Sequence, residues 1–173
     1  VPSWRVGAQF LRLEDVAALA SLAPLPQGVA RFLRRHRPRG DVRTLSARVD
    51  GEDALDLRAQ VEDAGWAVAG SIPGASGVDA RVQLNPTEGR IAIATENAVV
   101  RAPQILPEPL PISHAQGDLR VERDGRGGWR LRSHRLRLAN EDVRGTARFD
   151  IAYGPESGVM LDIGADFGDG DLA

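Results

Sequence analysis

The sequence contains no cysteine and no lysine. The absence of cysteine excludes disulfide bonds and thiolate metal sites. All 22 basic residues are therefore arginine, and with 24 acidic residues the formal net charge is −2. A general attraction to nucleic acid needs an excess of positive charge, so we expect no nucleic-acid partner.

The sequence also lacks any apolar run as long as the ~20 residues of a membrane-spanning helix, and it lacks a signal peptide. Aromatic residues make up only 5% of the chain. This scarcity disfavours a carbohydrate-binding or hydrolytic β-sandwich, which would need exposed aromatic rings and paired carboxylates. The chain opens without an initiator methionine and ends just after strand-like sequence. We therefore expect residues 1–173 to be a single segment of a larger protein.

Apolar residues recur at every second position in most of the chain, which is the pattern of strands with one buried face. The runs are Trp4–Val6–Ala8–Phe10, Leu45–Ala47–Val49, Leu55–Leu57–Ala59–Val61, Val78–Ala80–Val82–Leu84, Ile91–Ile93, Ala115–Gly117–Leu119–Val121, Leu136–Leu138, Val143–Gly145–Ala147–Phe149–Ile151 and Val159–Leu161–Ile163–Ala165–Phe167. Turn-forming dipeptides separate them, at Asp50-Gly51, Pro73-Gly74, Asn85-Pro86, Asp124-Gly125 and Gly154-Pro155. Short connections between such runs predict an antiparallel meander.

The two faces of these strands differ in composition. Arginine dominates the outward positions, whereas the inward positions mix aliphatic residues with many alanines and glycines. A two-layer sandwich usually fills such a face with bulkier side chains. Small residues also occur where a sheet curls tightly, so the pattern leaves both a groove and a packed face open. We predict a mostly β fold, a curled antiparallel sheet that forms an open apolar groove.

One region, residues 14–37, departs from the alternation and predicts a short two-helix insert after the first strand. Apolar residues have helical spacing over 14–22 and again over 27–36. Pro24 and Pro26 separate the two helices, and Pro38 follows the second. Arg31, Arg34 and Arg35 make the second helix basic. They are candidates for contact with anionic lipid headgroups, although cations at the end of a helix also occur simply because they favour the helix dipole.

No group of residues has the spacing of a catalytic or metal site. His36, His114 and His134 are far apart in dissimilar settings. The acidic run at 166–171 lacks the terminal glutamate of a calcium loop. We therefore predict no catalytic residues, no metal, no cofactor and no enzymatic activity.

Seven stretches carry a resemblance to a known family. They are residues 11–19 (LRLEDVAAL), 23–26 (APLP), 38–40 (PRG), 63–66 (DAGW), 72–77 (IPGASG), 107–112 (PEPLPI) and 136–142 (LRLANED). In this order and spacing they resemble the middle region of the YhdP family of AsmA-like bacterial envelope proteins, over nearly the whole chain.

The resemblance implies a role in the cell envelope. Related proteins are built from repeated β-grooves, are anchored in the inner membrane, extend across the periplasm and are implicated in moving phospholipid towards the outer membrane. The resemblance thus implies a periplasmic segment whose partners are phospholipid acyl chains and neighbouring β-groove segments of the same chain. It implies no catalytic residues.

The predicted function is conduction of phospholipid along the apolar groove; the alternative is a structural or partner-binding β module without lipid transport. The residues that we expect to face lipid sit at mid-strand on the apolar face: Ala47, Ala59, Val82, Ile93, Leu119, Ala147 and Leu161. The terminal strands carry no proline and few charges that would block pairing. We therefore also expect the chain to self-associate through its strand edges.

Overall fold

The computed structural model describes residues 3–19, 27–50, 54–70, 72–123, 128–154 and 158–168. Within these residues it contains ten strands and two short helices, α1 (Leu13–Leu19) and α2 (Gln27–His36). The strands are β1 (Ser3–Ala8), β2 (Leu11–Arg12), β3 (Arg39–Asp50), β4 (Ala54–Trp66), β5 (Gly74–Leu84), β6 (Glu88–Arg101), β7 (Leu110–Arg123), β8 (Trp129–Ala139), β9 (Arg144–Gly154) and β10 (Gly158–Gly168). The prediction of a mostly β chain with a two-helix insert is confirmed.

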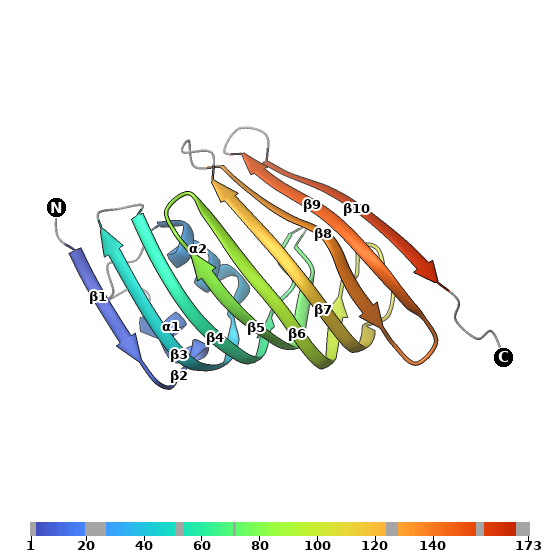
Figure 1. Ribbon diagram of the computed structural model, residues 1–173, viewed down its shortest axis with the longest axis horizontal. Coiled ribbons are helices and arrows are strands. Elements are labelled where there is room, and N and C mark those ends of the chain that lie inside the picture. The colour runs from blue at the N-terminus through green and yellow to red at the C-terminus, as the bar shows by residue number, and fades with distance from the viewer. Residues whose placement is uncertain are drawn as a thin grey trace.

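All ten strands form one antiparallel sheet (Figure 1). β1 pairs with β3, each strand from β3 to β9 pairs with the next one in the chain, and the short β2 also pairs with β3. β1 and β10 lie at opposite edges of the sheet and do not pair with each other. In the part of the chain that the structure describes, the sheet is therefore open and not a closed barrel.

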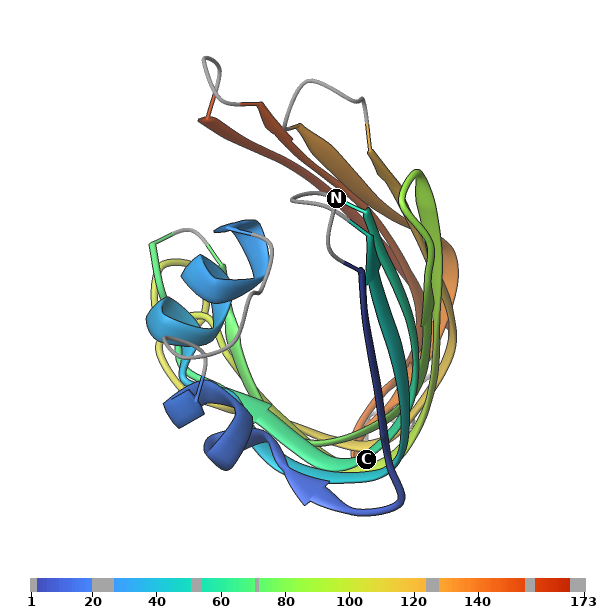
Figure 2. The ribbon, with the colours of Figure 1, turned by 90° about the vertical axis from the view of Figure 1, so that its left-hand side faces the viewer.

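The sheet curls strongly about its long axis. Figure 2, seen from the β1 edge, shows the strands bending through an arc with both helices on its concave side. Register shifts interrupt the pairing of β4 with β5 and of β8 with β9, and also that of β3 with β4, of β5 with β6 and of β7 with β8. Such bulges bend strands and increase their twist, so they account for the curl. The last three interruptions share a further feature.

The same close contact occurs at each of these three interruptions. A glycine on one strand faces a backbone carbonyl on the next, so that a Cβ atom at the glycine would lie only 2.7, 2.9 or 2.8 Å from the carbonyl oxygen. The three pairs, which we call the glycine–carbonyl contacts, are Gly40 with Asp63, Gly77 with Asn97, and Gly117 with Arg135. The bend also requires left-handed backbone at Gly77 (φ 74°) and Asn97 (φ 58°).

The helices follow β2 and lie against the N-terminal part of the sheet. α1 contacts β2 and β3, and α2 contacts α1. The end of α2 is tied to the segment after β4, because the Ala67 N–H donates to the His36 carbonyl (2.8 Å). Leu33 and His36 are buried there. The sequence predicts the first helix over 14–22; α1 covers Leu13–Leu19, and the rest of that prediction falls on residues 20–26, which lie outside the described residues.

One predicted turn has a clear physical basis in the structure. The Asn85 side-chain oxygen accepts hydrogen bonds from the backbone N–H groups of Thr87 (3.0 Å) and Glu88 (2.8 Å), which closes the connection between β5 and β6. Three other predicted turns, at Asp50-Gly51, Asp124-Gly125 and Gly154-Pro155, lie wholly or partly outside the described residues.

Candidate functional site

The concave face of the sheet is the candidate site, because unbroken rows of apolar partners cross it. Residues directly opposite each other in antiparallel strands point to the same face. The longest row runs from β1 to β10 through Val6, Ala47, Leu57, Leu84, Gly89, Val121, Leu131, Ile151 and Leu161. The next runs through Ala8, Leu45, Ala59, Val82, Ile91 and Leu119. These two rows form a continuous apolar strip along the sheet.

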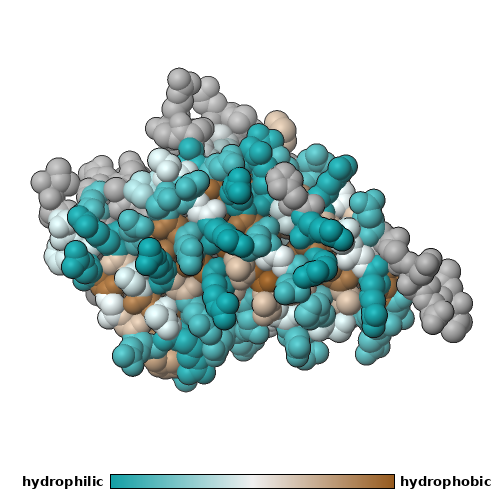
Figure 3. All heavy atoms as spheres, in the orientation of Figure 1, coloured by the Kyte–Doolittle hydropathy of each residue, from teal (hydrophilic) through white to brown (hydrophobic). Residues whose placement is uncertain are grey.

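The opposite face is polar. Figure 3 looks onto the convex side of the sheet, where hydrophilic side chains predominate. Because successive side chains of a strand alternate between faces, the apolar rows line the concave side. The sheet is one layer thick in the described residues, so no second sheet covers these rows.

The structure brings the predicted groove residues together on this face. Ala59, Val82 and Leu119 share one row, and Ala47 lies in the adjacent longest row. Two further predicted residues continue the strip: Ile93 pairs with Gly117, and Ala147 pairs with Leu136 and Ala165. The backbone of Leu161 pairs with Ile151, while its side chain lies outside the described set. That these residues contact acyl chains stays a prediction.

Exposure on the concave face is greatest at the two edges of the sheet. Trp4 and Val6 on β1 are 53% and 52% exposed, and Ile163 on β10 is 53% exposed, whereas Leu119 at the centre is 8% exposed. At the centre the curled sheet packs its own side chains together, and Ile93 lies against the buried cluster around Ala115. The apolar side chains are therefore exposed to a possible occupant at both edges of the sheet, and they are less exposed at its centre.

Two hydroxyl groups interrupt the apolar centre, and both are satisfied by backbone. Thr95 and Ser133 are each only 3% exposed. The Thr95 hydroxyl donates to the Gly77 carbonyl (2.5 Å), and the Ser133 hydroxyl donates to the Asp118 carbonyl (3.2 Å). A buried hydroxyl without a partner would be costly, so these bonds let the concave face remain effectively apolar.

Ion pairs cross the strands of the convex face. Arg90 holds Asp118 through two hydrogen bonds of 2.9 and 3.0 Å, and this lowers the pKa of the Asp118 carboxyl and raises the pKa of the arginine. The other pairs between strands are Arg43 with Glu62, Arg130 with Asp150, and Arg132 with both Glu122 and Asp150, whereas Arg43 with Asp41 and Arg48 with Asp50 pair within β3. Exposed pairs of this kind keep the face solvated and stabilise it only weakly.

The predicted headgroup residues lie on α2, at the N-terminal end of the concave side. Arg34 and Arg35 are exposed. The Arg35 guanidinium lies over Gly70, where a Cβ atom would come within 2.9 Å of it. The side chain of Arg31 lies outside the described set. Contact of these arginines with headgroups stays a prediction.

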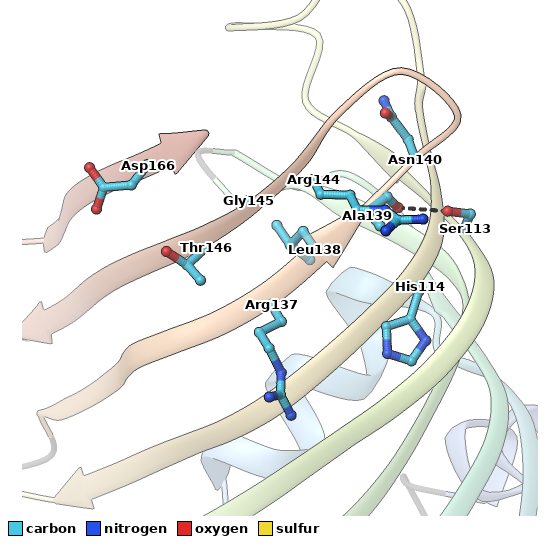
Figure 4. A pocket seen from close by; sticks show the side chains of 10 residues that line it. All are labelled: Ser113, His114, Arg137, Leu138, Ala139, Asn140, Arg144, Gly145, Thr146 and Asp166. Atoms are coloured by element: carbon cyan, nitrogen blue, oxygen red, sulfur yellow. Dashed lines mark hydrogen bonds between the residues drawn. The ribbon is translucent and has the colours of Figure 1, made fainter. Parts of the chain in front are cut away.

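A separate hollow of about 800 Å³ lies over β7–β10 and contains the residue types of hydrolytic sites (Figure 4). Its lining includes Ser113, His114 and Asp166. The Ser113 hydroxyl is engaged by the Ala139 carbonyl (3.0 Å). His114 on β7 and Asp166 on β10 are separated by two intervening strands, a distance of about 14 Å at ordinary strand spacing. These groups are too far apart for a nucleophile, base and carboxylate relay.

No group of three or more histidine, aspartate or glutamate side chains in the described residues is placed to hold a metal ion. No helix in this part of the chain is long and apolar enough to cross a membrane.

Fold and face together define a class: an open, curled, single-layer β-sheet protein with a continuous apolar concave face. Comparison with known families narrows this, because the family model described as YhdP protein matches residues 2–173. The chain belongs to the YhdP family, and this membership indicates a bacterial envelope protein of the AsmA-like type. No curated protein and no solved structure matches it.

Sequence reasoning missed the devices that bend the sheet. The glycine–carbonyl contacts and the buried Thr95 and Ser133 all lie within strands, where alternation alone predicts regular pairing. A glycine inside a strand is a known signal of a bulge or of close backbone approach, and Gly77 and Gly117 carry it. The hydroxyls had no comparable signal, because their partners are on neighbouring strands.

Proposed function

We propose that the chain is a segment of a periplasmic, inner-membrane-anchored protein that conducts phospholipid between the two membranes along its concave face. The observation that supports this most is the apolar row from Val6 to Leu161, which crosses the sheet without a charged residue. Acyl chains lying in it would be shielded from water at about 25 cal/mol per Å² of apolar surface covered. The proposed process needs an apolar path and a gradient, and no covalent step.

The distribution of charge supports the proposed orientation of the lipid. An ionised headgroup cannot enter an apolar strip without a large desolvation penalty. The open side of the sheet lets headgroups stay in water while the acyl chains follow the strip. Arg34 and Arg35 stand exposed on α2 at one end of it, where they would attract an anionic headgroup.

The exposed edges support a second element of the proposal, that neighbouring β-groove segments of the same chain extend the strip. β1 and β10 each offer one side of unpaired backbone groups. Trp4 and Val6 at one edge, and Ile163 at the other, continue the apolar face up to the rim. A segment paired there would lengthen the path without a break.

Site-specific photo-crosslinking in the full-length protein tests the proposal. Photoreactive residues at Val82, Ile93 and Ala147 should crosslink to phospholipid in membranes, because these positions line the strip. Arg48 and Arg81 on the convex face are the matched controls and should give none. Crosslinks to protein alone from the concave positions would instead favour a partner-binding β module.

A charged residue introduced on the apolar strip tests whether lipid transfer can be lost without loss of folding. Ala147→Asp should stop lipid transfer while leaving the protein folded, because an open face keeps the new carboxylate hydrated. Thr146→Asp, on the neighbouring residue and the opposite face, is the matched control and should leave transfer unchanged. Unimpaired transfer by Ala147→Asp would refute conduction along this face.

A further inference from the structure

A basic hollow is lined by arginines that point to the convex face, and its lining also includes Leu57, Leu84, Gly89 and Leu119 of the apolar rows. It lies over β4–β8 and has a volume of about 990 Å³. Six arginines line it, against only three carboxylates, those of Asp56, Glu88 and Asp118. The arginines are Arg58, Arg90, Arg120, Arg132, Arg135 and Arg137. A chain with a net charge of −2 thus concentrates positive charge at this one place.

Four of the arginines stand in one straight row across the sheet. The register pairs Arg58 with Gln83, Gln83 with Arg90, Arg90 with Arg120, and Arg120 with Arg132. Arg90, Arg120 and Arg132 follow one another at about 4.8 Å at their backbones, whereas Gln83 separates Arg58 from Arg90, which are about 9.6 Å apart. Like charges directly opposite each other destabilise a sheet, so a bound anion would relieve the repulsion that Arg120 meets between Arg90 and Arg132.

The carboxylates of the chain neutralise only part of this charge. Arg90 is held by Asp118, and Arg132 by Glu122 (3.0 Å). Arg137 donates to the Gln116 side-chain oxygen (2.6 Å). The remaining three, Arg58, Arg120 and Arg135, are exposed and form no ion pair with any carboxylate of the described residues. Their guanidinium donors are available to a ligand.

We propose that this hollow binds an anion that carries two or more phosphate groups. A phosphate monoester bears about −1.5 to −2 charges and three acceptor oxygens, so one group can engage two guanidiniums of neighbouring strands. An extended acidic peptide presents a single negative charge about every 6.8 Å on one side, which is too sparse for cations at 4.8 Å. The charge density of the row therefore favours phosphate chemistry over carboxylates.

The same chemistry exists in two sources, a soluble oligophosphate and the phosphorylated sugar headgroup of a lipid. The arginines of the row alternate with the residues of the apolar strip and so point to the opposite face, where their ligand would be recognised separately from the conducted acyl chains. A test of this proposal is therefore independent of whether the chain conducts lipid.

Titration calorimetry of the full chain with tripolyphosphate tests the site. The double variant Arg120→Gln/Arg135→Gln should bind at least about tenfold more weakly than wild type, which corresponds to losing about 1.4 kcal/mol of binding free energy. The matched control Arg5→Gln/Arg144→Gln removes the same charge outside the hollow and should bind like wild type. Arg120→Gln alone should raise the melting temperature without ligand, because it breaks the row of like charges.

Two additional probes test whether the hollow prefers phosphate over carboxylate and whether the phosphate comes from a soluble molecule or from a lipid. A glutamate-rich peptide of equal charge should bind more weakly than tripolyphosphate. The second probe is phosphatidylcholine vesicles in which one tenth of the lipid is a diphosphorylated disaccharide lipid. If a lipid headgroup is the source, these vesicles should bind wild type more tightly than Arg120→Gln/Arg135→Gln. If the source is soluble, only tripolyphosphate should show this difference. The proposal is overturned if neither phosphate probe binds, if the two double variants bind alike, or if the peptide binds as tightly.

Discussion

Gly77 is the position at which the bend of the sheet can be tested most directly, through Gly77→Ala. Its φ of 74° is a conformation that residues with a Cβ rarely adopt. The added Cβ would lie 2.9 Å from the Asn97 carbonyl oxygen and 3.3 Å from the Ala98 Cα. Both neighbours are backbone atoms of β6, so neither can rotate away.

The magnitude follows from two contributions. Holding alanine in left-handed backbone costs about 1–2 kcal/mol. Relieving the contact would move β5 away from β6 and strain the bond between the Gly77 carbonyl and the buried Thr95 hydroxyl, a group whose loss of a partner costs about 1–3 kcal/mol. We expect a total loss of about 2–5 kcal/mol in unfolding free energy. In a domain of this length that lowers the melting temperature by about 4–20 °C.

Thermal and urea unfolding followed by circular dichroism measure this loss. Gly7→Ala is the matched control, because Gly7 is also in a strand but its Cβ would have only an ordinary contact of 3.8 Å with the Leu45 carbonyl oxygen. It should melt like wild type. If Gly77→Ala melted within 1–2 °C of Gly7→Ala, the glycine–carbonyl contacts would not determine the bend.

Four further outcomes are expected. Thr95→Val should lower the unfolding free energy by about 1–3 kcal/mol in urea titration, since it leaves the Gly77 carbonyl unpaired; an unchanged midpoint would contradict that. Asn97→Gly should be neutral or stabilising by calorimetry, because its φ of 58° suits glycine, whereas a clear loss would mean that the side chain matters. The Arg90 hydrogen bonds lower the pKa of Asp118, so the stability that they contribute is present above the ordinary pKa of the carboxyl and is lost as pH falls below about 4. Asp118→Asn should therefore make the melting temperature fall less steeply at acid pH than in wild type. An equally steep fall would argue that the pair does not contribute. The chain should self-associate through β1 and β10, seen by sedimentation over a wide concentration range, and a strict monomer would show that these edges are protected.

The strands and their faces were predictable because they depend on a local signal. Alternation along each run fixes which residues share a face, and the antiparallel order follows from short connections. Asn85 is an example in which turn, residue and hydrogen bonds agree with the sequence. The open groove was predictable only as one of two options, because the same small residues suit a groove or a packed face.

Contacts between distant residues were not predictable. Gly77 and Asn97 are twenty positions apart, and neither residue shows from its own neighbours that it faces the other. The row from Arg58 to Arg132 likewise depends on the register of five neighbouring strands, which no single stretch of sequence determines. The sequence showed that outward positions are rich in arginine, but not which arginines stand opposite each other or lack a carboxylate.

The glycine–carbonyl contacts also recur at a nearly regular interval along the chain. Gly40, Gly77 and Gly117 are 37 and 40 residues apart, and each pair of strands repeats one bend. Two strands add about 9.6 Å along the sheet and return the chain to the same direction. Deleting or inserting one such hairpin should therefore shorten or lengthen the concave path by about 1 nm and keep its apolar side inward. The distance that the path covers would then be encoded by the number of hairpins, as an integer count that evolution can change one unit at a time.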